Sequence, residues 1–250
     1  MRQPNAFIVL REYKAIAMDA ALQGILVIDK PRGMTSMRAV ECVRRLLGGP
    51  KAGHAGTLDP LASGVLVIAI GRSTKDIPSL MGLEKLYETE IDLSATTNTL
   101  DTEGVRQPVE LRGPPPTRSE IEEKLVQFRG TFLQAPPAFS AVKINGRRAY
   151  DMARNGEDVR PAERNVTVHE LSIVGYSWPV LKLSIRCAKG FYVRSLARDL
   201  AQSLGLAGHC LSIRRLAVGP YSVQTAMAIT DSPQPLRAAI QSMKPLDDSL

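Results

Sequence analysis

Cysteine and histidine are scarce in this sequence, and their placement argues against two kinds of site. The three cysteines, Cys42, Cys187 and Cys210, are odd in number and widely spaced, and no Cys-x-x-Cys pair occurs. The three histidines are equally dispersed along the chain. We therefore expect neither a disulfide framework nor a metal site, and reduced thiols favour the cytoplasm.

Long apolar runs are missing as well. No run approaches the roughly 20 residues that a membrane-spanning helix requires. Near the start, the apolar stretch 6–10 is interrupted by Arg11 and Glu12, so it is too short for the core of a signal peptide. We therefore expect no membrane partner.

The composition is that of a soluble globular protein with a positive charge. Of the 250 residues, 44% are hydrophobic and 23% are charged, which is outside the range of disordered chains. The 32 lysines and arginines exceed the 25 acidic residues, so the net charge is +7. This excess favours a polyanionic partner, with nucleic acid preferred to a membrane surface.

The chain is organised around residues 53–75, where a glycine-rich loop leads into a short apolar run. Val65 to Ile70 is continuous, rich in β-branched residues and bracketed by glycines, which predicts a strand buried on both faces. In the loop, Asp59 precedes Pro60 and is therefore extended or in a turn. Taken alone, Asp59 is best interpreted as a turn aspartate that bonds its own backbone.

The complete string changes that interpretation, because it resembles motif II of the TruB family of tRNA pseudouridine synthases. The matching positions are Gly53, His54, Gly56, Leu58, Asp59, Pro60 and Gly64. The resemblance implies that Asp59 is the catalytic nucleophile and that His54, Gly56 and Leu58 bind the substrate. Further family-like motifs occur in family order between about Gly24 and Tyr221.

The segment from Gly24 to Ser36 resembles motif I of the same family. A strand is predicted from Gly24, followed by a turn and by a helix capped by Thr35 or Ser36. The resemblance implies that Lys30 and Pro31 help to build the floor of the active site, and we expect a supporting role for both.

Residues 87–93 alternate between apolar and acidic side chains, which predicts a strand with one buried face. A tyrosine at the start of such a strand is usually part of the core. The resemblance implies instead that Tyr87 stacks on the target base, with proton acceptor as a second role. The segment 97–104 is also family-like, although Asn98 stands where an aspartate is common.

The middle of the chain is basic. Residues 106–117, rich in proline, predict a stiff connector, and Ser119 with Glu122 predicts a capping box at the next helix. A run of basic residues follows in one surface segment. Those that we expect to bind the substrate are Lys143, Arg147, Arg148 and Arg154. Such a run is usually a solvated face, but it also suits phosphate contacts. The resemblance implies an insertion at about 130–165 that grips an RNA stem-loop.

Two strands, 166–176 and 180–187, precede a glycine turn and an amphipathic helix that ends at Gly205. Arg194 lies in the first turn of that helix, where the positive end of the helix dipole disfavours a cation. The ordinary interpretation is an arginine exposed at the surface. The family resemblance of this segment implies that Arg194 pairs with Asp59, that Lys189 and Tyr192 line the pocket, and that Ile213 forms its wall.

The resemblance implies an α/β fold of the α+β type, with a large mixed, mainly antiparallel sheet flanked by helices. We expect an N-terminal extension at 1–22, a catalytic domain at 23–224 and a C-terminal tail at 225–250, where a PUA-type RNA-binding domain is expected to be absent. A helical pattern runs through Leu236 to Ile240.

The reaction implied by the resemblance turns uridine 55 in the T stem-loop of tRNA into pseudouridine. It requires no cofactor, and we expect a monomeric enzyme. Attack on the anomeric carbon, addition to the pyrimidine ring and removal of the ribose 2′-proton remain open as the role of Asp59. One rival is a noncatalytic RNA-binding or tRNA-folding module on the same scaffold. Another is a guide-RNA-dependent enzyme that modifies ribosomal RNA.

Overall fold

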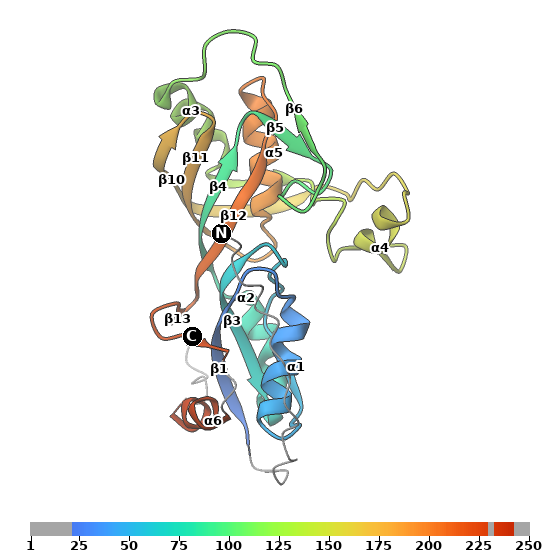
Figure 1. Ribbon diagram of the computed structural model, residues 1–250, viewed down its shortest axis with the longest axis vertical. Coiled ribbons are helices and arrows are strands. Elements are labelled where there is room, and N and C mark those ends of the chain that lie inside the picture. Colours follow the sequence, from blue (N-terminus) through green and yellow to red (C-terminus); the bar gives the residue numbers. More distant parts are fainter. Residues whose placement is uncertain (1–21, 230–232, 243–250) are drawn as a thin grey trace, which may run out of the picture.

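A computed structural model describes residues 22–229 and 233–242. The extension predicted at 1–22 therefore lies outside the described residues, apart from Leu22. The described chain is elongated, with two lobes stacked along its longest axis (Figure 1).

One large sheet runs through both lobes. Its strand order is β14-β1-β3-β12-β4-β11-β10-β7, with β2 beside β3 and β13 beside β12. Two pairs, β1 with β14 and β3 with β12, are parallel, and the other pairs are antiparallel. The strands are β1 (Gly24–Lys30), β2 (Ala52–His54), β3 (Ser63–Ile70), β4 (Lys85–Asp92), β7 (Gly130–Gln134), β10 (Arg164–Ser177), β11 (Val180–Cys187), β12 (His209–Val218), β13 (Tyr221–Ser222) and β14 (Met227–Ala228). The fold is thus α+β with a mixed, mainly antiparallel sheet, as predicted.

Helices flank the sheet in each lobe (Figure 1). The α-helices are α1 (Ser36–Leu46), α2 (Ile77–Gly82), α3 (Arg118–Leu125), α4 (Ala149–Arg154), α5 (Val193–Ser203) and α6 (Pro233–Ser242). Two 3-10 helices, η1 (Gly71–Asp76) and η2 (Val126–Phe128), and two small two-stranded sheets, β5 (Ala95–Thr97) with β6 (Arg106–Pro108) and β8 (Lys143–Ile144) with β9 (Arg147–Arg148), complete the described elements. The arm that carries α4 projects sideways from the body.

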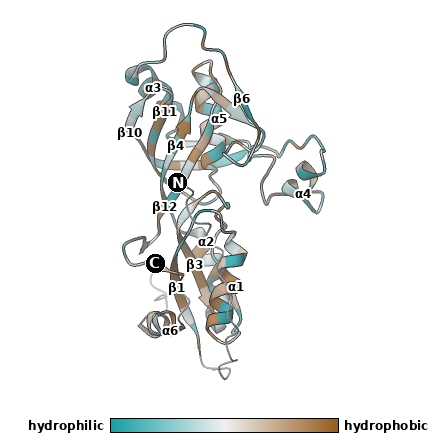
Figure 2. Ribbon diagram, viewed as in Figure 1, coloured by the Kyte–Doolittle hydropathy of each residue, from teal (hydrophilic) through white to brown (hydrophobic). Residues whose placement is uncertain are grey.

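Strand β3 is buried on both faces, as its continuous apolar run predicted. Leu66, Ile68 and Ile70 pack into the main core, whereas Val65 and Val67 pack into a second core on the opposite face. Figure 2 shows β1 and β3 as two apolar strands side by side. The loop that precedes β3 is therefore attached to one of the most deeply buried strands of the molecule.

Local signals placed most helices, with one correction at α3. Thr35 caps α1 by accepting a hydrogen bond from the backbone N–H of Arg38, as expected. The capping box predicted from Ser119 is wrong, because the N-cap of α3 lies two residues earlier. Thr117 and Glu120 form the reciprocal pair instead, and Ser119 is already helical.

The connector predicted at 106–117 also needs correction, because its first residues form β6 and pair with β5. At the other end of the chain, residues expected to be a tail belong to the lower lobe. β14 pairs with β1, and Leu236 and Ile240 of α6 are buried in the main core. The helical pattern through Leu236 to Ile240 is confirmed.

Gly64 marks a close approach between β3 and β12. Its φ is +104°, and a Cβ at this position would lie 2.1 Å from the backbone oxygen of Arg215. We expect Gly64→Ala to lower the free energy of unfolding by about 3 kcal/mol, because backbone strain and a rigid clash add.

Chemical denaturation of the wild type and the variant measures this difference. Gly205→Ala is the matched control, because Gly205 also has positive φ but a Cβ there would meet no atom within 4 Å. A Gly64→Ala variant no less stable than Gly205→Ala would contradict the clash.

Candidate active site

A cavity of about 590 Å³ opens beside the central strands β4 and β12. Its walls come from the loop before β3, the inward faces of β4 and β12, the turn before α5 and the base of the α4 arm. The sequence-predicted residues that line it are Gly56, Leu58, Asp59, Tyr87, Lys189, Tyr192, Arg194 and Ile213. Segments far apart in sequence therefore meet here because the strand order brings them together.

Helix α1 holds the loop that carries Asp59. The Ser36 hydroxyl is buried and bonds both backbone groups of Leu58, accepting from its N–H at 2.8 Å and donating to its carbonyl at 2.9 Å. The N–H of Gly33 donates to the carbonyl of Pro60 at 2.7 Å. The motif I turn thus braces the motif II loop, and the Asp59 side chain remains 36% exposed at the cavity.

Arg194 forms the ion pair with Asp59 that the family resemblance implied. Its Nη2 lies 2.8 Å from the Asp59 carboxylate, and its side chain is only 5% exposed. The same guanidinium donates to the carbonyls of Thr99 at 2.8 Å and Phe139 at 2.9 Å. Carbonyl and carboxylate oxygens on several sides therefore fix its plane.

Asp101 is a functional candidate that the sequence analysis did not single out. Its carboxylate lies 3.4 Å from Nη1 of Arg194, and its side chain is 2% exposed. The Thr99 hydroxyl and the Glu103 N–H hold the other carboxylate oxygen. One guanidinium therefore serves two carboxylates. The only sequence signal for Asp101 was its place in the family-like segment 97–104, and that segment does not predict the contact with Arg194.

The carboxylates of Asp59 and Asp101 also act on a third acidic residue, Glu103. Burial raises the pKa of Glu103, and the charges of Asp101 and Asp59 raise it further.

Tyr87 and Arg215 face each other on adjacent strands and both line the cavity. Burial raises the pKa of the Tyr87 phenol, whereas the charge and hydrogen bond of Arg215 act to lower it. Arg215 is 1% exposed and also donates to the carbonyls of Val65 and Gly56. Sequence reasoning missed Arg215, although it lies two residues after Ile213 and so shares the inward phase of β12.

Lys30, for which motif I implied a supporting role, is held by the turn that follows β1. It is fully buried, and its ammonium group donates to the carbonyls of Pro31 and Met34. Burial lowers its pKa to about 8, while the charge of Asp59 acts in the opposite direction. Neither Lys30 nor Pro31 lines the cavity.

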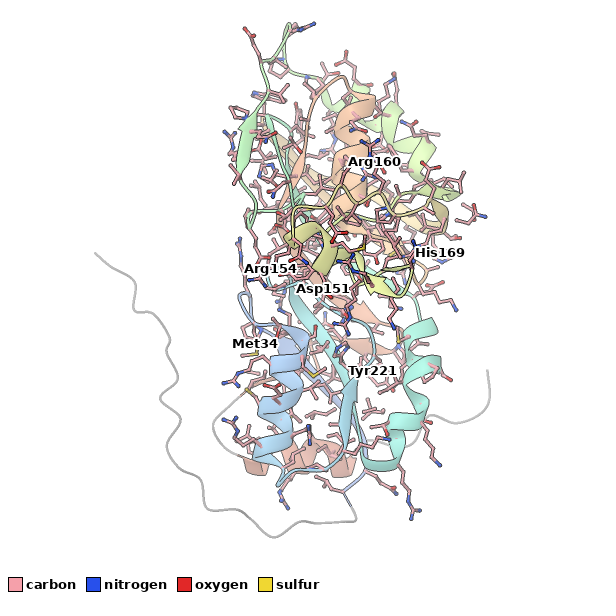
Figure 3. The ribbon with its side chains drawn as sticks, turned by 90° about the vertical axis from the view of Figure 1, so that its right-hand side faces the viewer. Met34, Asp151, Arg154, Arg160, His169 and Tyr221 are labelled. Atoms are coloured by element: carbon pink, nitrogen blue, oxygen red, sulfur yellow. The ribbon has the colours of Figure 1, made fainter. Side chains whose placement is uncertain are left out.

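Several predicted substrate-binding residues lie away from the cavity. His54, on β2, does not line it, and burial lowers the pKa of its imidazole. The cations Lys143, Arg147, Arg148 and Arg154 lie on the projecting arm, where Figure 3 shows Asp151 and Arg154 on α4. Arg147 is held by two contacts with Glu157, at 2.6 and 3.1 Å, so its charge is partly neutralised.

Within the described residues, no three or more histidine, cysteine or carboxylate side chains are grouped so that they could hold a metal ion. No helix in the same part of the chain has the length and apolar character needed to cross a membrane.

Comparison with known proteins gives consistent results. Residues 44–193 match the model of the TruB family pseudouridylate synthase N-terminal domain. The chain is 47% identical over 210 residues to a protein of Ruegeria pomeroyi named tRNA pseudouridine synthase B, covering 83% of this chain and 68% of that protein. It is 44% identical over 210 residues to the protein of the same name from a Caulobacter species, covering 84% and 67% of the two chains.

The chain thus spans about two thirds of the length of such relatives, and 62% for a Brucella ovis protein of the same name. Among solved structures, a chain described in the crystal structure of a Cbf5-Nop10-Gar1 complex superposes with a TM-score of 0.66. That match has 26% identity and covers 87% of this chain and 55% of the other.

Proposed function

Because this chain belongs to the TruB family of pseudouridylate synthases, we propose that it isomerises uridine 55 in the T arm of tRNA to pseudouridine, using Asp59. The observation that carries the proposal is the ion pair between Asp59 and Arg194 in the lining of a cavity of about 590 Å³. Relatives named tRNA pseudouridine synthase B support tRNA as the substrate class.

The reaction is an isomerisation in which no atom is gained or lost. The bond between C1′ of the ribose and N1 of uracil breaks, the base rotates, and C5 bonds to C1′. The C5 proton is lost and N1 gains a proton, so no redox carrier is required. The protein must supply an oxygen nucleophile or base, a stacking surface and a site that excludes water.

Asp59 fits the first of these requirements. The guanidinium of Arg194 binds and directs one oxygen of the carboxylate, so the other is available to the nucleotide. Attack on C1′, addition to the ring and removal of the 2′-proton all begin at atoms close to the bond between ribose and base. Asp59 serves as the reactive carboxylate in each of these routes.

Tyr87 and Ile213 fit the second requirement. They lie on adjacent strands and line the same cavity, so a base swung out of its stack would find an aromatic face and an apolar wall. Such a base reaches a recessed carboxylate only after it leaves the helix stack. We therefore propose that the target uridine is flipped into this cavity.

The proposal is tested by incubating the purified protein with an unmodified tRNA transcript and mapping pseudouridine by carbodiimide modification and reverse transcription. We expect a single modified position, uridine 55. A noncatalytic RNA-binding module would bind the transcript and leave every uridine unchanged. Pseudouridine at another position would support the isomerisation but would contradict uridine 55 as the target.

The cations of the arm are proposed to contact the RNA backbone, so their removal is expected to change the salt dependence of binding. Arg148→Gln should reduce the slope of log affinity against log salt by about 0.7 to 0.9, the value for one lost phosphate contact. Arg147→Gln should change it less, because Glu157 already engages Arg147.

Fluorescence anisotropy with a T-arm RNA at several salt concentrations gives these slopes. Arg186→Gln is the matched control, because Arg186 lies outside both the arm and the cavity lining and pairs with Glu170. Equal slopes for the wild type and Arg148→Gln would show that this part of the arm does not contact the RNA.

We propose that the enzyme acts as a monomer without a cofactor. The cytoplasm is the proposed compartment, because the described cysteines Cys42, Cys187 and Cys210 are all free thiols.

A further inference from the structure

The cavity carries more positive charge than the pair of Asp59 and Arg194 needs. Its lining contains one carboxylate, that of Asp59, and five cationic side chains, namely Lys85, Arg164, Lys189, Arg194 and Arg215. Two of these cations, Lys85 and Arg215, are 7% and 1% exposed. Burying a charge without an opposite charge is costly, so such cations are expected where the substrate brings or develops negative charge.

Lys85 has a donor left over for the cavity. Its ammonium group carries three N–H donors. Two of them are directed at backbone carbonyls, that of Met81 at 2.6 Å and that of Leu83. The described chain offers no further acceptor to this ammonium group, which lines the cavity. The third N–H is therefore available to a bound ligand.

The position of Lys85 on β4 places it beyond Tyr87, on the side away from Asp59. Lys85 precedes Tyr87 by two residues, so both side chains face the cavity about 7 Å apart along the strand. The charge of Asp59 acts on Tyr87, whereas Lys85 experiences the charges of Arg215 and Lys189. A uracil over Tyr87 with its ribose bond at Asp59 would thus extend its outer edge toward Lys85.

We propose that Lys85 is a further catalytic residue, whose ammonium group stabilises the negative charge that uracil carries after its bond to the ribose has broken. This inference rests on the proposed function. When the bond between C1′ and N1 breaks, its electron pair stays with the base and is shared among N1, O2 and O4. Lys85 donates a hydrogen bond to a ring carbonyl oxygen and keeps its proton.

The rest of the step balances without another reactant. In one route C1′ takes an oxygen of Asp59, and this new bond breaks when C5 attacks C1′. In the other route C2′ loses its proton to Asp59 and a double bond forms between C1′ and C2′, and Asp59 returns the proton to C2′ when C5 bonds to C1′. When C5 then bonds to C1′, the ring's negative charge is consumed and the hydrogen bond to Lys85 weakens. Stabilisation that is strongest at the charged stage accelerates the reaction rather than tightening binding of the ground state.

The ionisation of Lys85 fits this role at neutral pH. Burial and the charge of Arg215 lower its pKa to about 8, with Lys189 acting in the same direction and Cys187 against it. The cation is therefore present below about pH 8 and is lost as the pH rises through that value. Activity that depends on the cation should decline on the alkaline side.

The test compares Lys85→Met and Lys85→Arg with the wild type in single-turnover reactions on a T-arm RNA. Lys85→Met should lower the rate of glycosidic cleavage about 10²-fold, as for loss of one charge-stabilising donor, with RNA affinity within about threefold. Lys85→Arg should recover at least tenfold of that loss. It should also move the alkaline decline to higher pH, because a guanidinium stays protonated.

A second substrate separates charge stabilisation from a structural role. Fluorine at C5 withdraws electrons and makes the ring anion easier to form, so 5-fluorouridine at the target should reduce the Lys85→Met loss about tenfold. Lys182→Met is the matched control, because Lys182 is paired with Glu90 outside the cavity lining, and it should match the wild type.

Three results would overturn the inference: an equal Lys85→Met loss on both bases, an unmoved alkaline decline in Lys85→Arg, or weakened RNA binding with an unchanged single-turnover rate. The last would identify Lys85 as a phosphate contact. The proposed function fails separately, if the wild type forms no pseudouridine in the same reactions.

Discussion

Asp59→Asn is expected to lower pseudouridine formation at least about 10⁴-fold, the size of loss seen when a catalytic nucleophile is removed. The amide keeps the shape of the side chain and can still accept a hydrogen bond from Arg194, so the loop should retain its position. What it loses is the negative charge that every open route for Asp59 requires. RNA affinity should therefore remain within about threefold, because binding depends mainly on cations and stacking.

Single-turnover carbodiimide mapping and anisotropy binding, done on the same preparation, measure both quantities. Asp199→Asn is the matched control, because Asp199 also pairs with an arginine, Arg198 at 2.7 Å, but does not line the cavity. Modification by Asp59→Asn within tenfold of the wild type would end the assignment of the reactive carboxylate. Loss of RNA binding in parallel would instead indicate a structural role.

Arg194→Lys is expected to lower turnover about 10³-fold, more than it lowers RNA affinity. The guanidinium meets Asp59 and Asp101 as well as two backbone carbonyls, and a lysine cannot reach acceptors on all these sides. Asp101 would then be a buried carboxylate with a weakened partner, so the free energy of unfolding should also fall, by about 2 kcal/mol.

The measurements are single-turnover rate, RNA affinity and chemical denaturation for each variant. Arg198→Lys is the control on the same helix, since Arg198 donates to Asp199 and to the carbonyl of Ala135 outside the cavity. A variant with normal turnover and poor RNA binding would contradict the role proposed for Arg194. If only the free energy of unfolding falls, Arg194 stabilises the fold and has no role in the reaction.

Predictions that depend on neighbouring residues agreed with the structure. The apolar run of β3, the alternation in β4 and the N-cap of α1 each report on a few consecutive side chains and their burial. The error at α3 has the same origin, because Thr117 with Glu120 and Ser119 with Glu122 satisfy the same local pattern. Only the helix boundary set by the preceding prolines and by packing distinguishes them.

The predicted contact between Asp59 and Arg194 came from the family resemblance, since the two residues are far apart in the chain. Charges on inward strand positions were overlooked for a different reason. Lys85 and Arg215 share the inward phase of Tyr87 and Ile213, but a charged residue in an alternating strand is usually assigned to solvent. Their burial depends on the neighbouring strands that cover them.

Apolar periodicity, glycine and proline act over a few residues, so the buried strand β3 and the loop that presents Asp59 could be predicted from the sequence. The tertiary structure alone decided that Asp101 shares the guanidinium of Arg194 and that Lys85 and Arg215 turn a cavity strongly positive. These contacts join β4, β12, α5 and the loop after β5, and only the order of strands in the sheet brings charges so distant in sequence within reach of one another.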